Sequence, residues 1–430
     1  MNRSASSQRS NKAVVRGERR APRLLVLDGS YTYSTISALG LEQGVVSRDL
    51  GGFFDHVWTI YPFGNLNAVA TDVGDSQQYE MNERHTFIQA RFGHFRMLSK
   101  LPVLNFLIGQ VDLIRQLRRL VQREHIDLIR AGDPLYVGLL GWAVAKSCGI
   151  PLAIRVPLHN ERTRRLTGVA MYPRLLRSPT LERRIEHFVL KRAALVVAPS
   201  KDNLEFALEH GAHPDRVAIF PYGNLLSGAH WVEPRKRAVD AALFKRLGIL
   251  PGNYLLCVSR LRDLKYPDDA LRCLAAARAK GHDVRLVLAG EGEMRKALQK
   301  LAAELGVSEH LVFAGNVDQA SLAQLYANAA VVISPLTGRA LSEAALGGAP
   351  IVAYDLDWQG DLIVTGESGE LVEFRDQEAF GAAVVKFLDD RNYASRMGQG
   401  ARDRSVKMFD PKSLTDNEQA AYARVLGRTK

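Results

Sequence analysis

The amino-acid sequence predicts an α/β protein built from two doubly wound parallel sheets. The chain has 430 residues, of which 47% are hydrophobic, which is enough to form the cores of two domains of about 200 residues each. Strand-like apolar runs alternate with helix-like segments along most of the chain, as is typical of parallel sheets with helices on both faces. A less regular, partly basic stretch at 225–248 interrupts this alternation once. We therefore expect two Rossmann-like sheets that face each other across a cleft.

The first block of alternation contains six strand-like runs with helical patterns between them. Strands are expected at 23–28, 56–61, 126–130, 151–156, 194–200 and 217–223. Helices are expected at 135–148, 180–193 and 201–211.

The second block repeats the same order. Strands are expected at 254–259, 284–290, 311–315, 331–335 and 350–354, and helices from Pro267 and at 293–305, 319–329 and 340–347. Pro267 is followed by two acids, which favours a helix start, because proline fits the first turn and carboxylates suit the positive end. The expected units are a disordered basic leader (1–22), a first domain (23–225), a linker (226–248), a second domain (249–409) and a terminal helix (410–430).

Composition narrows the class of protein. The three cysteines, Cys148, Cys257 and Cys273, share no metal-type spacing, so we expect them to be reduced, as in the cytoplasm. No apolar run is long enough to span a membrane, and residues 1–22 lack the apolar core of a secretory signal. Nucleic-acid binding is not expected, since no known module and no suitable pattern of basic and aromatic residues is present.

The leader carries much of the positive charge. Residues 1–23 contain seven basic side chains and one acid, out of a formal net charge of +11 for the chain. We interpret this segment as a solvated tail. The alternative is that this segment is attracted to an anionic membrane. We expect the protein to be cytoplasmic, and a finer hypothesis is that it associates peripherally with the inner face of the membrane.

The loops after the strands of the second domain carry the strongest functional signal. In open parallel sheets, ligands bind beyond the carboxyl ends of the strands. Arg260 and Lys265 follow the first of these strands and offer two positive charges, which suit a diphosphate. Gly290 and Gly315 follow the next two strands and could allow close approach of a ligand, or simply turn the chain.

The segment 337–343 crosses from a strand end into a helix, with the sequence Thr-Gly-Arg-Ala-Leu-Ser-Glu. The first amides of such a helix are unpaired and favour an anion. Glu343 lies about one turn into the helix, where its carboxylate could accept hydrogen bonds from a ribose diol. The alternative is a glutamate that only stabilises the helix end. The candidate donor-binding residues are Gly290, Gly315, Thr337, Gly338, Arg339, Ala340, Leu341 and Glu343.

This constellation resembles the nucleotide-sugar lobe of family 4 glycosyltransferases, which have the two-lobed GT-B architecture. The resemblance covers most of 194–408, including Ser259-Arg-Leu with Lys265, Phe313-Ala-Gly-Asn-Val, and Glu343-Ala leading to Gly348-Ala-Pro-Ile-Val-Ala. It implies that Arg260 and Lys265 neutralise the donor diphosphate and that Glu343 holds the ribose.

The sequence departs from the family pattern in three places. The first glutamate of the family's glutamate pair is absent, and either Pro335 or Thr337 takes its place. The glycine pair of the first loop reads Gly29-Ser30. Where the family has a Gly-Gly-x-x-Glu turn, Asp357 and Asp361 could instead meet the sugar hydroxyls.

In the first domain, His159 is a candidate catalytic residue, and Gly29, Ser30 and Asp133 are candidates for contacts with the acceptor or the sugar. His159 follows a strand and could exchange hydrogen bonds near neutral pH, or it could be an ordinary loop residue. Asp133 could orient an acceptor hydroxyl or cap the next helix. Residues 85–100 and the arginines of 111–123 are interpreted as amphipathic helices with basic solvated faces, the alternative being a surface that faces the acceptor or the membrane.

We therefore expect a glycosyltransferase that moves a sugar from a nucleotide-diphosphate sugar, a UDP-sugar, to an acceptor hydroxyl that is lipid-linked or acidic. The resemblance implies retention at the anomeric carbon. The sequence shows no loop suited to a divalent ion, so we expect neither a metal nor a cofactor. Two alternatives stay open: a sugar-nucleotide epimerase of the same architecture, and a non-catalytic partner subunit that binds a sugar nucleotide.

Overall fold

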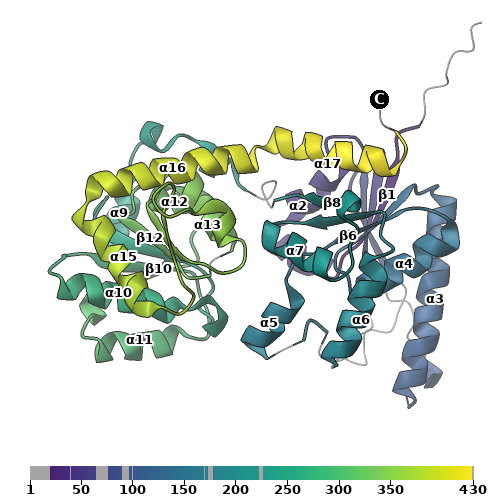
Figure 1. The fold of residues 1–430 in the computed structure, drawn as a ribbon, viewed down its shortest axis with the longest axis horizontal. Coiled ribbons are helices and arrows are strands. Elements are labelled where there is room, and N and C mark those ends of the chain that lie inside the picture. Colours follow the sequence, from purple (N-terminus) through teal and green to yellow (C-terminus); the bar gives the residue numbers. More distant parts are fainter. Residues whose placement is uncertain are drawn as a thin grey trace, which may run out of the picture.

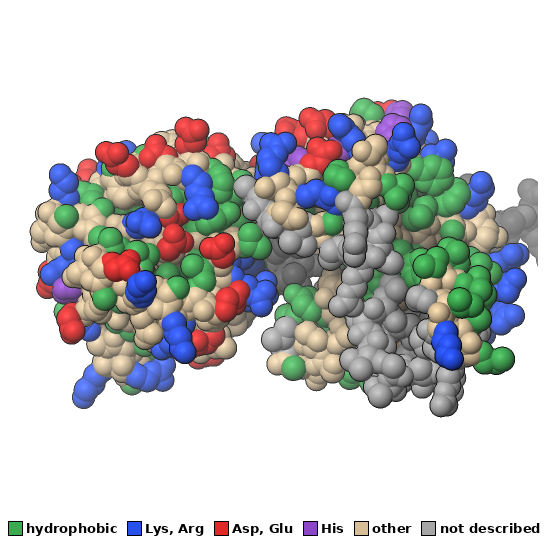
Figure 2. Space-filling model, turned by 90° about the horizontal axis from the view of Figure 1, so that it is seen from below, with side chains coloured by type: hydrophobic (Ala, Val, Ile, Leu, Met, Phe, Trp, Pro, Cys, Tyr) green, Lys and Arg blue, Asp and Glu red, His purple; other side chains and the backbone are tan. Residues whose placement is uncertain are grey.

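The chain folds into two lobes, each built around its own sheet (Figure 1). The computed structural model describes residues 20–428 except 39, 64–75, 90–95, 99, 169, 173–177, 222–225 and 337. Figure 2 shows the same two lobes from below.

The first lobe holds an eight-stranded sheet in the order β3-β4-β2-β1-β5-β6-β7-β8. Its strands are β1 (Arg23–Leu27), β2 (His56–Tyr61), β3 (Gln77–Asn82), β4 (His85–Gln89), β5 (Leu128–Ala131), β6 (Leu152–Arg155), β7 (Leu195–Ala198) and β8 (Val217–Ile219). All neighbouring strands are parallel except the edge strand β3, which is antiparallel to β4.

The second lobe holds a six-stranded parallel sheet in the order β11-β10-β9-β12-β13-β14. Its strands are β9 (Tyr254–Val258), β10 (Arg285–Ala289), β11 (Leu311–Gly315), β12 (Val331–Ser334), β13 (Ile351–Tyr354) and β14 (Glu370–Val372). Strand order turns from β10 to β12 at β9, so the loops after β9 and β12 flank the switch point where ligands bind in such sheets.

Helices connect the strands and cover both sheets. In the first lobe they are α1 (Tyr33–Ala38), α2 (Glu42–Val46), α3 (Pro102–Arg123), α4 (Tyr136–Cys148), α5 (Asn160–Thr167), α6 (Pro179–Leu190) and α7 (Lys201–Glu209). Next along the chain come α8 (Gly228–Trp231), α9 (Ala241–Leu247), α10 (Pro267–Ala279), α11 (Arg295–Glu304), α12 (Gln319–Ala327), α13 (Arg339–Leu346), α14 (Gln359–Leu362), α15 (Gln377–Asp389), α16 (Arg391–Phe409) and α17 (Pro411–Val425).

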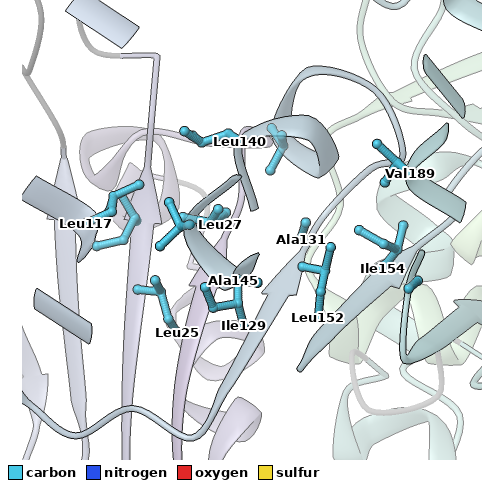
Figure 3. Packing of buried hydrophobic residues seen from close by; sticks show 14 of the residues in the cluster. Leu25, Leu27, Leu117, Ile129, Ala131, Leu140, Ala145, Leu152, Ile154 and Val189 are labelled. Carbon is cyan, nitrogen blue, oxygen red and sulfur yellow. The ribbon is translucent and has the colours of Figure 1, made fainter. Parts of the chain in front are cut away.

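The centre of the first sheet is buried on both faces. Leu25 and Leu27 of β1 pack with Leu117 of α3 and Leu140 of α4 (Figure 3). The alternate residues of β1 point to the opposite face, where they meet a second apolar cluster, as the two-residue period of a strand requires. Burial on both faces explains why these strands are continuous apolar runs in the sequence.

The terminal helix α17 returns from the second lobe to the first (Figure 1). Tyr422 of this helix is buried against Phe54 and Phe220 of the first lobe. Gln419 Nε2 donates to the carbonyl oxygen of Leu50 over 2.7 Å. The helix is therefore part of the core of the first lobe, although it follows the second lobe in sequence.

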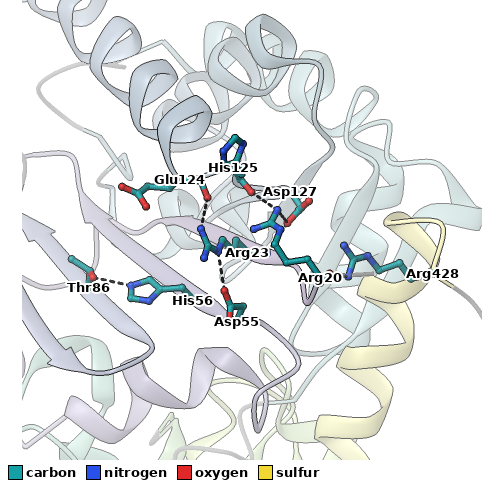
Figure 4. A network of polar contacts seen from close by, with 9 residues as sticks. All are labelled: Arg20, Arg23, Asp55, His56, Thr86, Glu124, His125, Asp127 and Arg428. Atoms are coloured by element: carbon teal, nitrogen blue, oxygen red, sulfur yellow. Dashed lines mark hydrogen bonds and ion pairs between the residues drawn. The ribbon is translucent and has the colours of Figure 1, made fainter. Parts of the chain in front are cut away.

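Polar contacts stabilise the first sheet at the amino-terminal ends of its strands (Figure 4). Arg23 donates to the Asp55 carboxylate over 2.9 Å and to the Glu124 carbonyl over 3.0 Å. Arg428, beyond α17, donates to the carbonyl of Arg20 over 2.7 Å. Of the basic residues counted in the leader, Arg20 and Arg23 are therefore engaged with the fold.

The structure differs from the sequence prediction at 85–100. Residues 85–89 form β4, whereas an amphipathic helix was expected; residues 96–98 form a short 3-10 turn, and the rest of this segment lies partly outside the described residues. His85, Thr86, Phe87 and Ile88 are all buried, so the segment lacks the polar–apolar alternation that marks a half-exposed strand.

The stretch expected as an irregular linker also has structure. It contains α8 and α9, and Leu243 and Phe244 are buried in the core of the second lobe. All three cysteines are free. Burial raises the pKa of the Cys257 thiol to about 12, which makes it unreactive.

Candidate functional site

The candidate donor cations lie in the loop after β9. Lys265 is half-buried and Arg260 is exposed. Burial lowers the pKa of Lys265, and the nearby charge of Arg260 lowers it further, while the Asp357 carboxylate acts in the opposite direction. Neither cation forms an ion pair within 4.0 Å with another described residue. The loop therefore holds two positive charges that lack a direct carboxylate partner in this part of the chain.

Glycines let the neighbouring loops pack closely against this one. A Cβ atom at Gly290 would lie 2.0 Å from the carbonyl oxygen of Ser259, and φ at Gly290 is 137°. At Gly292 a Cβ would lie 2.3 Å from the carbonyl oxygen of Leu261. The amide of Gly290 also donates to the carbonyl of Gly315 over 2.7 Å. These glycines support the loop that carries Arg260 through backbone contacts, which is the turn-forming role that the sequence left open.

Glu343 lies one turn into α13 and is 3% exposed. Its Oε2 accepts a hydrogen bond from the Tyr326 hydroxyl over 3.2 Å, and its Oε1 lies 3.1 Å from Nε of Arg339. Burial raises the pKa of Tyr326, and the Glu343 carboxylate adds to this effect, so the hydroxyl remains a donor. Both carboxylate oxygens of Glu343 thus have partners. Of the two partners, the Arg339 side chain is half-exposed and lies toward solvent.

The other residues of the segment 337–343 differ in how deeply they are buried. Gly338 precedes α13 with φ of 68°, and Leu341 is fully buried in the core. The Leu341 amide donates to the Gly338 carbonyl over 3.0 Å, so it is already used inside the turn. Ala340 is half-buried. Thr337 lies outside the described residues.

Behind Glu343 lies a histidine that the sequence did not indicate. His230 of α8 is fully buried, and its ring centroid is 5.9 Å from that of Tyr326. Its Nε2 contacts Gln319 Oε1 over 2.8 Å. Burial lowers the pKa of His230, so the ring is neutral at pH 7. No sequence motif linked His230 to Tyr326, because His230 lies in the segment expected to be a linker and Tyr326 lies on α12.

The first residue of α14, Gln359, holds the segment 335–338 in place. Gln359 is 1% exposed. Its Nε2 donates to the carbonyls of Pro335 and Tyr354, each over 2.9 Å, and its Oε1 accepts from the Ser334 hydroxyl over 3.0 Å. The start of the segment 335–338 is therefore positioned by the amino-terminal residue of α14.

Asp357, just before α14, and Asp361, within α14, interact with residues of the first lobe. Asp357 has φ of 58°, and its pKa is raised by burial first and then by the charge of Asp202 in the first lobe. Arg162 and Lys265, one from each lobe, oppose this rise. Asp361 Oδ2 accepts a hydrogen bond from the amide of Lys201, the first residue of α7, over 2.9 Å. The structure thus brings Asp357 beside Lys265 at the junction of the lobes and places Asp361 on a helix terminus.

His159 is the residue that precedes α5 and caps it. Its Nδ1 accepts a hydrogen bond from the Arg162 amide over 3.3 Å, so the proton of the neutral ring is on Nε2. Burial lowers the pKa of His159. Arg162 in turn makes two contacts with Asp202, at 2.5 and 2.7 Å. The cap fixes the ring orientation and leaves Nε2–H as its donor.

Asp133 is buried at the end of β5. It accepts hydrogen bonds from the Tyr172 hydroxyl over 2.5 Å and from the Leu135 amide over 2.8 Å. Burial raises the pKa of Asp133 to about 6 in spite of these bonds. The Leu135 bond is the capping role that the sequence offered as an alternative, and the aromatic partner was not expected.

The first loop of the first lobe is organised by Asp28. Burial alone would raise the pKa of Asp28, but Arg48, 2.5 Å away, and Ser30 lower it to about 2. A Cβ at Gly29 would lie 2.0 Å from the ring of Phe63. Gly29 is thus needed for packing, and Ser30 is exposed beside it.

No group of three or more histidine, cysteine, aspartate or glutamate side chains in the described ranges could hold a metal ion. Among the helices that the structure describes, none has the length and apolar character needed to cross a bilayer.

Comparisons with known proteins agree with this architecture. Residues 69–223 match the family model described as a glycosyl transferase 4-like domain, and residues 240–404 match the one described as glycosyl transferases group 1. A D-inositol 3-phosphate glycosyltransferase of Thermomonospora curvata is 30% identical over 329 residues, which are 72% of this chain and 74% of the relative.

A second relative comes from Mycolicibacterium smegmatis. Its GDP-mannose-dependent α-(1-6)-phosphatidylinositol monomannoside mannosyltransferase is 30% identical over 317 residues, covering 69% of this chain and 76% of the relative.

Solved structures share the fold at low sequence identity. HepE of Anabaena, in complex with UDP, has a TM-score of 0.67 at 16% identity and covers 94% of this chain and 100% of its own. Sucrose-phosphate synthase of Thermosynechococcus elongatus has a TM-score of 0.68 at 17% identity, covering 95% and 100%. The expected pair of parallel-sheet lobes in a GT-B arrangement is confirmed. From the family matches and the relatives together, the chain belongs to the family 4-like glycosyltransferases of GT-B fold.

Proposed function

We propose that this glycosyltransferase transfers a sugar from a UDP-sugar to a hydroxyl of a lipid-linked or acidic acceptor, with retention and without a metal ion. The observation that carries the proposal is the cation pair Arg260 and Lys265. These two charges lie on a loop beside the switch point of the second sheet and have no carboxylate partner among the described residues. A diphosphate would complete this pairing through charge-assisted hydrogen bonds.

The same pair supplies the main chemical requirement of the reaction. As the glycosidic bond to the donor breaks, negative charge collects on the leaving diphosphate. Preorganised positive charge that is partly shielded from water stabilises this charge most strongly. Half-buried Lys265 meets that condition, and the two cations together could take the place of a divalent ion. Addition of a metal chelator should therefore leave the transfer rate unchanged.

Residues of both lobes would frame the donor sugar. Asp357 lies near Lys265 and faces Arg162 and Asp202 of the first lobe. The Nε2–H of His159 is set by its cap on α5 and can donate to a sugar or phosphate oxygen. Retention would follow if the departing phosphate oxygen takes the proton of the acceptor hydroxyl on the same face of the sugar.

Glu343 would receive the ribose diol after a change of partner. Its Oε1 is paired with Arg339, so a ribose hydroxyl would have to displace that guanidinium. Arg339 would then be released beside Gly338 and could join the phosphate contacts. This exchange keeps the buried carboxylate satisfied in both states.

The names of relatives support the acceptor class. One acts on D-inositol 3-phosphate and another on a phosphatidylinositol monomannoside, so both acceptors carry phosphate, and the second is a lipid. HepE binds UDP, whereas the Mycolicibacterium smegmatis relative is named as GDP-mannose-dependent, so the choice of UDP depends on the nucleotide panel. We place the activity in the cytoplasm, at the inner face of the membrane, where a lipid acceptor and a nucleotide sugar meet.

Thermal shift with a nucleotide panel tests the donor site. UDP, GDP, ADP and their sugar conjugates would be compared, and a ligand at 100 times its Kd adds about 2.7 kcal/mol of stability. Only the uridine compounds should raise the melting temperature of the wild type, and Arg260→Ala or Lys265→Ala should abolish the shift. Arg262→Ala is the matched control, since Arg262 is in the same loop but pairs with Glu293. A shift with GDP compounds alone would overturn the nucleotide assignment.

A further inference from the structure

We propose that the amino-terminal end of α3 docks on an anionic lipid bilayer and inserts its exposed aliphatic side chains into the interface. The acceptor end of the first lobe would then face the membrane. The role in presenting a lipid acceptor rests on the proposed function, whereas the docking itself does not.

Large apolar side chains are concentrated at this end of the helix. Of the sixteen exposed large hydrophobic residues among those described, seven lie between positions 97 and 111. They are Met97 (97% exposed), Leu101 (54%), Val103 (74%), Leu104 (44%), Leu107 (56%), Ile108 (38%) and Val111 (48%). Seen from below, hydrophobic side chains gather on the right-hand part of the first lobe, where Figure 1 places the lower end of α3 (Figure 2). A contiguous patch of this kind marks an interaction site.

The opposite face of α3 already has its partner. Leu113, Leu117 and Val121 are buried in the core of the first lobe. The exposed aliphatic residues therefore are not needed to hold the helix on the sheet. They are available for a second apolar environment.

The outward stripe of α3 changes character along its length. Positions 104, 108, 111, 115, 118 and 122 follow one another at intervals of three and four and are all exposed, so they form one stripe. The first three are Leu, Ile and Val, and the next two are Arg115 and Arg118. At 1.5 Å per residue, Leu104 and Arg115 are about 16 Å apart along the axis. A helix tilted against the bilayer would thus immerse its apolar end and hold the arginines at the level of the lipid headgroups.

Charge selects an anionic bilayer as the occupant. Residues 96–124 contain six basic side chains and two acids, and one of these acids, Asp112, accepts a hydrogen bond from Gln116. The excess of four positive charges complements negative headgroups. Apolar insertion combined with flanking arginines is the chemistry of interfacial helices.

The position of the patch suits a lipid acceptor. Gln110 of α3 accepts a hydrogen bond from the hydroxyl of Tyr136 over 2.7 Å. Tyr136 begins α4 directly after the strand end that carries Asp133, and its ring centroid is 6.0 Å from that of Tyr172. The exposed end of α3 is therefore next to the carboxyl end of β5, on the acceptor side of the lobe.

Vesicle flotation with the full-length protein tests the docking. The wild type should float with vesicles of phosphatidylcholine containing about a third phosphatidylglycerol, and it should bind pure phosphatidylcholine at least tenfold more weakly. The double variant Leu107→Glu, Val111→Glu should lose at least tenfold in binding to the anionic vesicles. The matched control is Val232→Glu, Leu250→Glu, which alters exposed apolar residues of the second lobe and should bind like the wild type.

A second variant tests the charged part of the stripe. Replacing Arg115, Arg118 and Arg119 with Gln should weaken binding about a hundredfold at low salt, and added salt should reduce the difference. Unchanged binding of either α3 variant would overturn the proposal, because attachment would then come from elsewhere, for example from the basic leader. Failure of the wild type to bind, or concentration-dependent dimerisation through the same residues, would overturn it as well.

The thermal shift measures folding and donor binding independently of vesicle binding. The nucleotide-induced thermal shift of each α3 variant should equal that of the wild type, because α3 lies in the first lobe. Loss of vesicle binding with an intact shift supports the docking. If neither the wild type nor any variant shows a nucleotide-induced thermal shift, the proposed donor site is contradicted. The vesicle result would still test the docking, because docking does not depend on the donor site.

Discussion

Replacing Gln359 with leucine should destabilise the second lobe and loosen the donor loop. Gln359 is almost completely buried and uses both ends of its amide: two N–H groups donate to the Pro335 and Tyr354 carbonyls, and its oxygen accepts from the Ser334 hydroxyl. Leucine has a similar volume but can make none of these bonds. The variant therefore removes three polar partners without opening a large cavity.

The magnitude follows from the three bonds. A net contribution of about 1 kcal/mol each gives a loss of about 3 kcal/mol, and carbonyls left unsatisfied in the interior push the value upward. The greater apolar character of leucine offsets a part of this loss. For a lobe of this size, about 3 kcal/mol corresponds to a decrease of roughly 6–12 °C in Tm.

Urea denaturation followed by tryptophan fluorescence would measure the loss, with Gln399→Leu as the control. Gln399 is exposed, and among the described residues its side chain bonds only Asp403, so its replacement should change the free energy of unfolding by about 0.5 kcal/mol or less. The KM for the donor should rise in Gln359→Leu, because Pro335 leads into the donor loop. A loss below 1 kcal/mol together with an unchanged donor KM would refute the reasoning.

Three further changes have clear expected outcomes. The pKa of Asp133 is raised to about 6 from 3.8, so the folded state holds the proton more tightly than the unfolded state. The free energy of unfolding should therefore fall by about 2 kcal/mol as pH rises from 4 to 6, and Asp133→Asn should flatten this slope in urea titrations at several pH values. Asp361→Ala removes the carboxylate on the Lys201 amide, so X-ray scattering should show a wider spread of lobe orientations. Gly290→Ala forces a Cβ against the Ser259 carbonyl, and both Tm and nucleotide affinity should fall; wild-type values would contradict the packing argument.

Most strands of both sheets could be predicted from sequence because they are buried on two faces. The expected run at 56–61 is β2, which has the same ends and is buried in all but its first residue. The expected run at 311–315 also has the same ends as β11, although β11 is an edge strand whose residues are all half-buried. Such strands are short apolar segments between polar or glycine-containing loops, which is a strong local signal. The strands β3 and β4 gave no such signal. β3 is an exposed polar edge strand with the sequence Gln-Gln-Tyr-Glu-Met-Asn, and its pairing with β4 depends on tertiary contacts.

The residues around Glu343 show where sequence reasoning ends. That Glu343 faces inward from the first turn of α13 follows from helix geometry and could be foreseen. Its pairing with Arg339 is an i,i+4 contact and was also within reach. The hydroxyl of Tyr326 and the ring of His230 could not be placed beside it, because they come from two separate helices whose packing is decided by the core of the lobe.

The two lobes differ in predictability for a physical reason. A phosphate site is built from a strand end, a glycine turn and a helix start, and all three are consecutive in sequence. Arg260 and Lys265 could therefore be singled out without knowing any long-range contact. The proposed acceptor side has no such unit. Asp133 meets Tyr172 and Tyr136 meets Gln110, and the exposed end of α3 lies beside them only because α3 and α4 pack on the same face of the sheet. An acceptor site assembled from the ends of separate helices can change its specificity by altering those ends, while the donor loops, held backbone to backbone at Gly290 and Gly292, stay fixed.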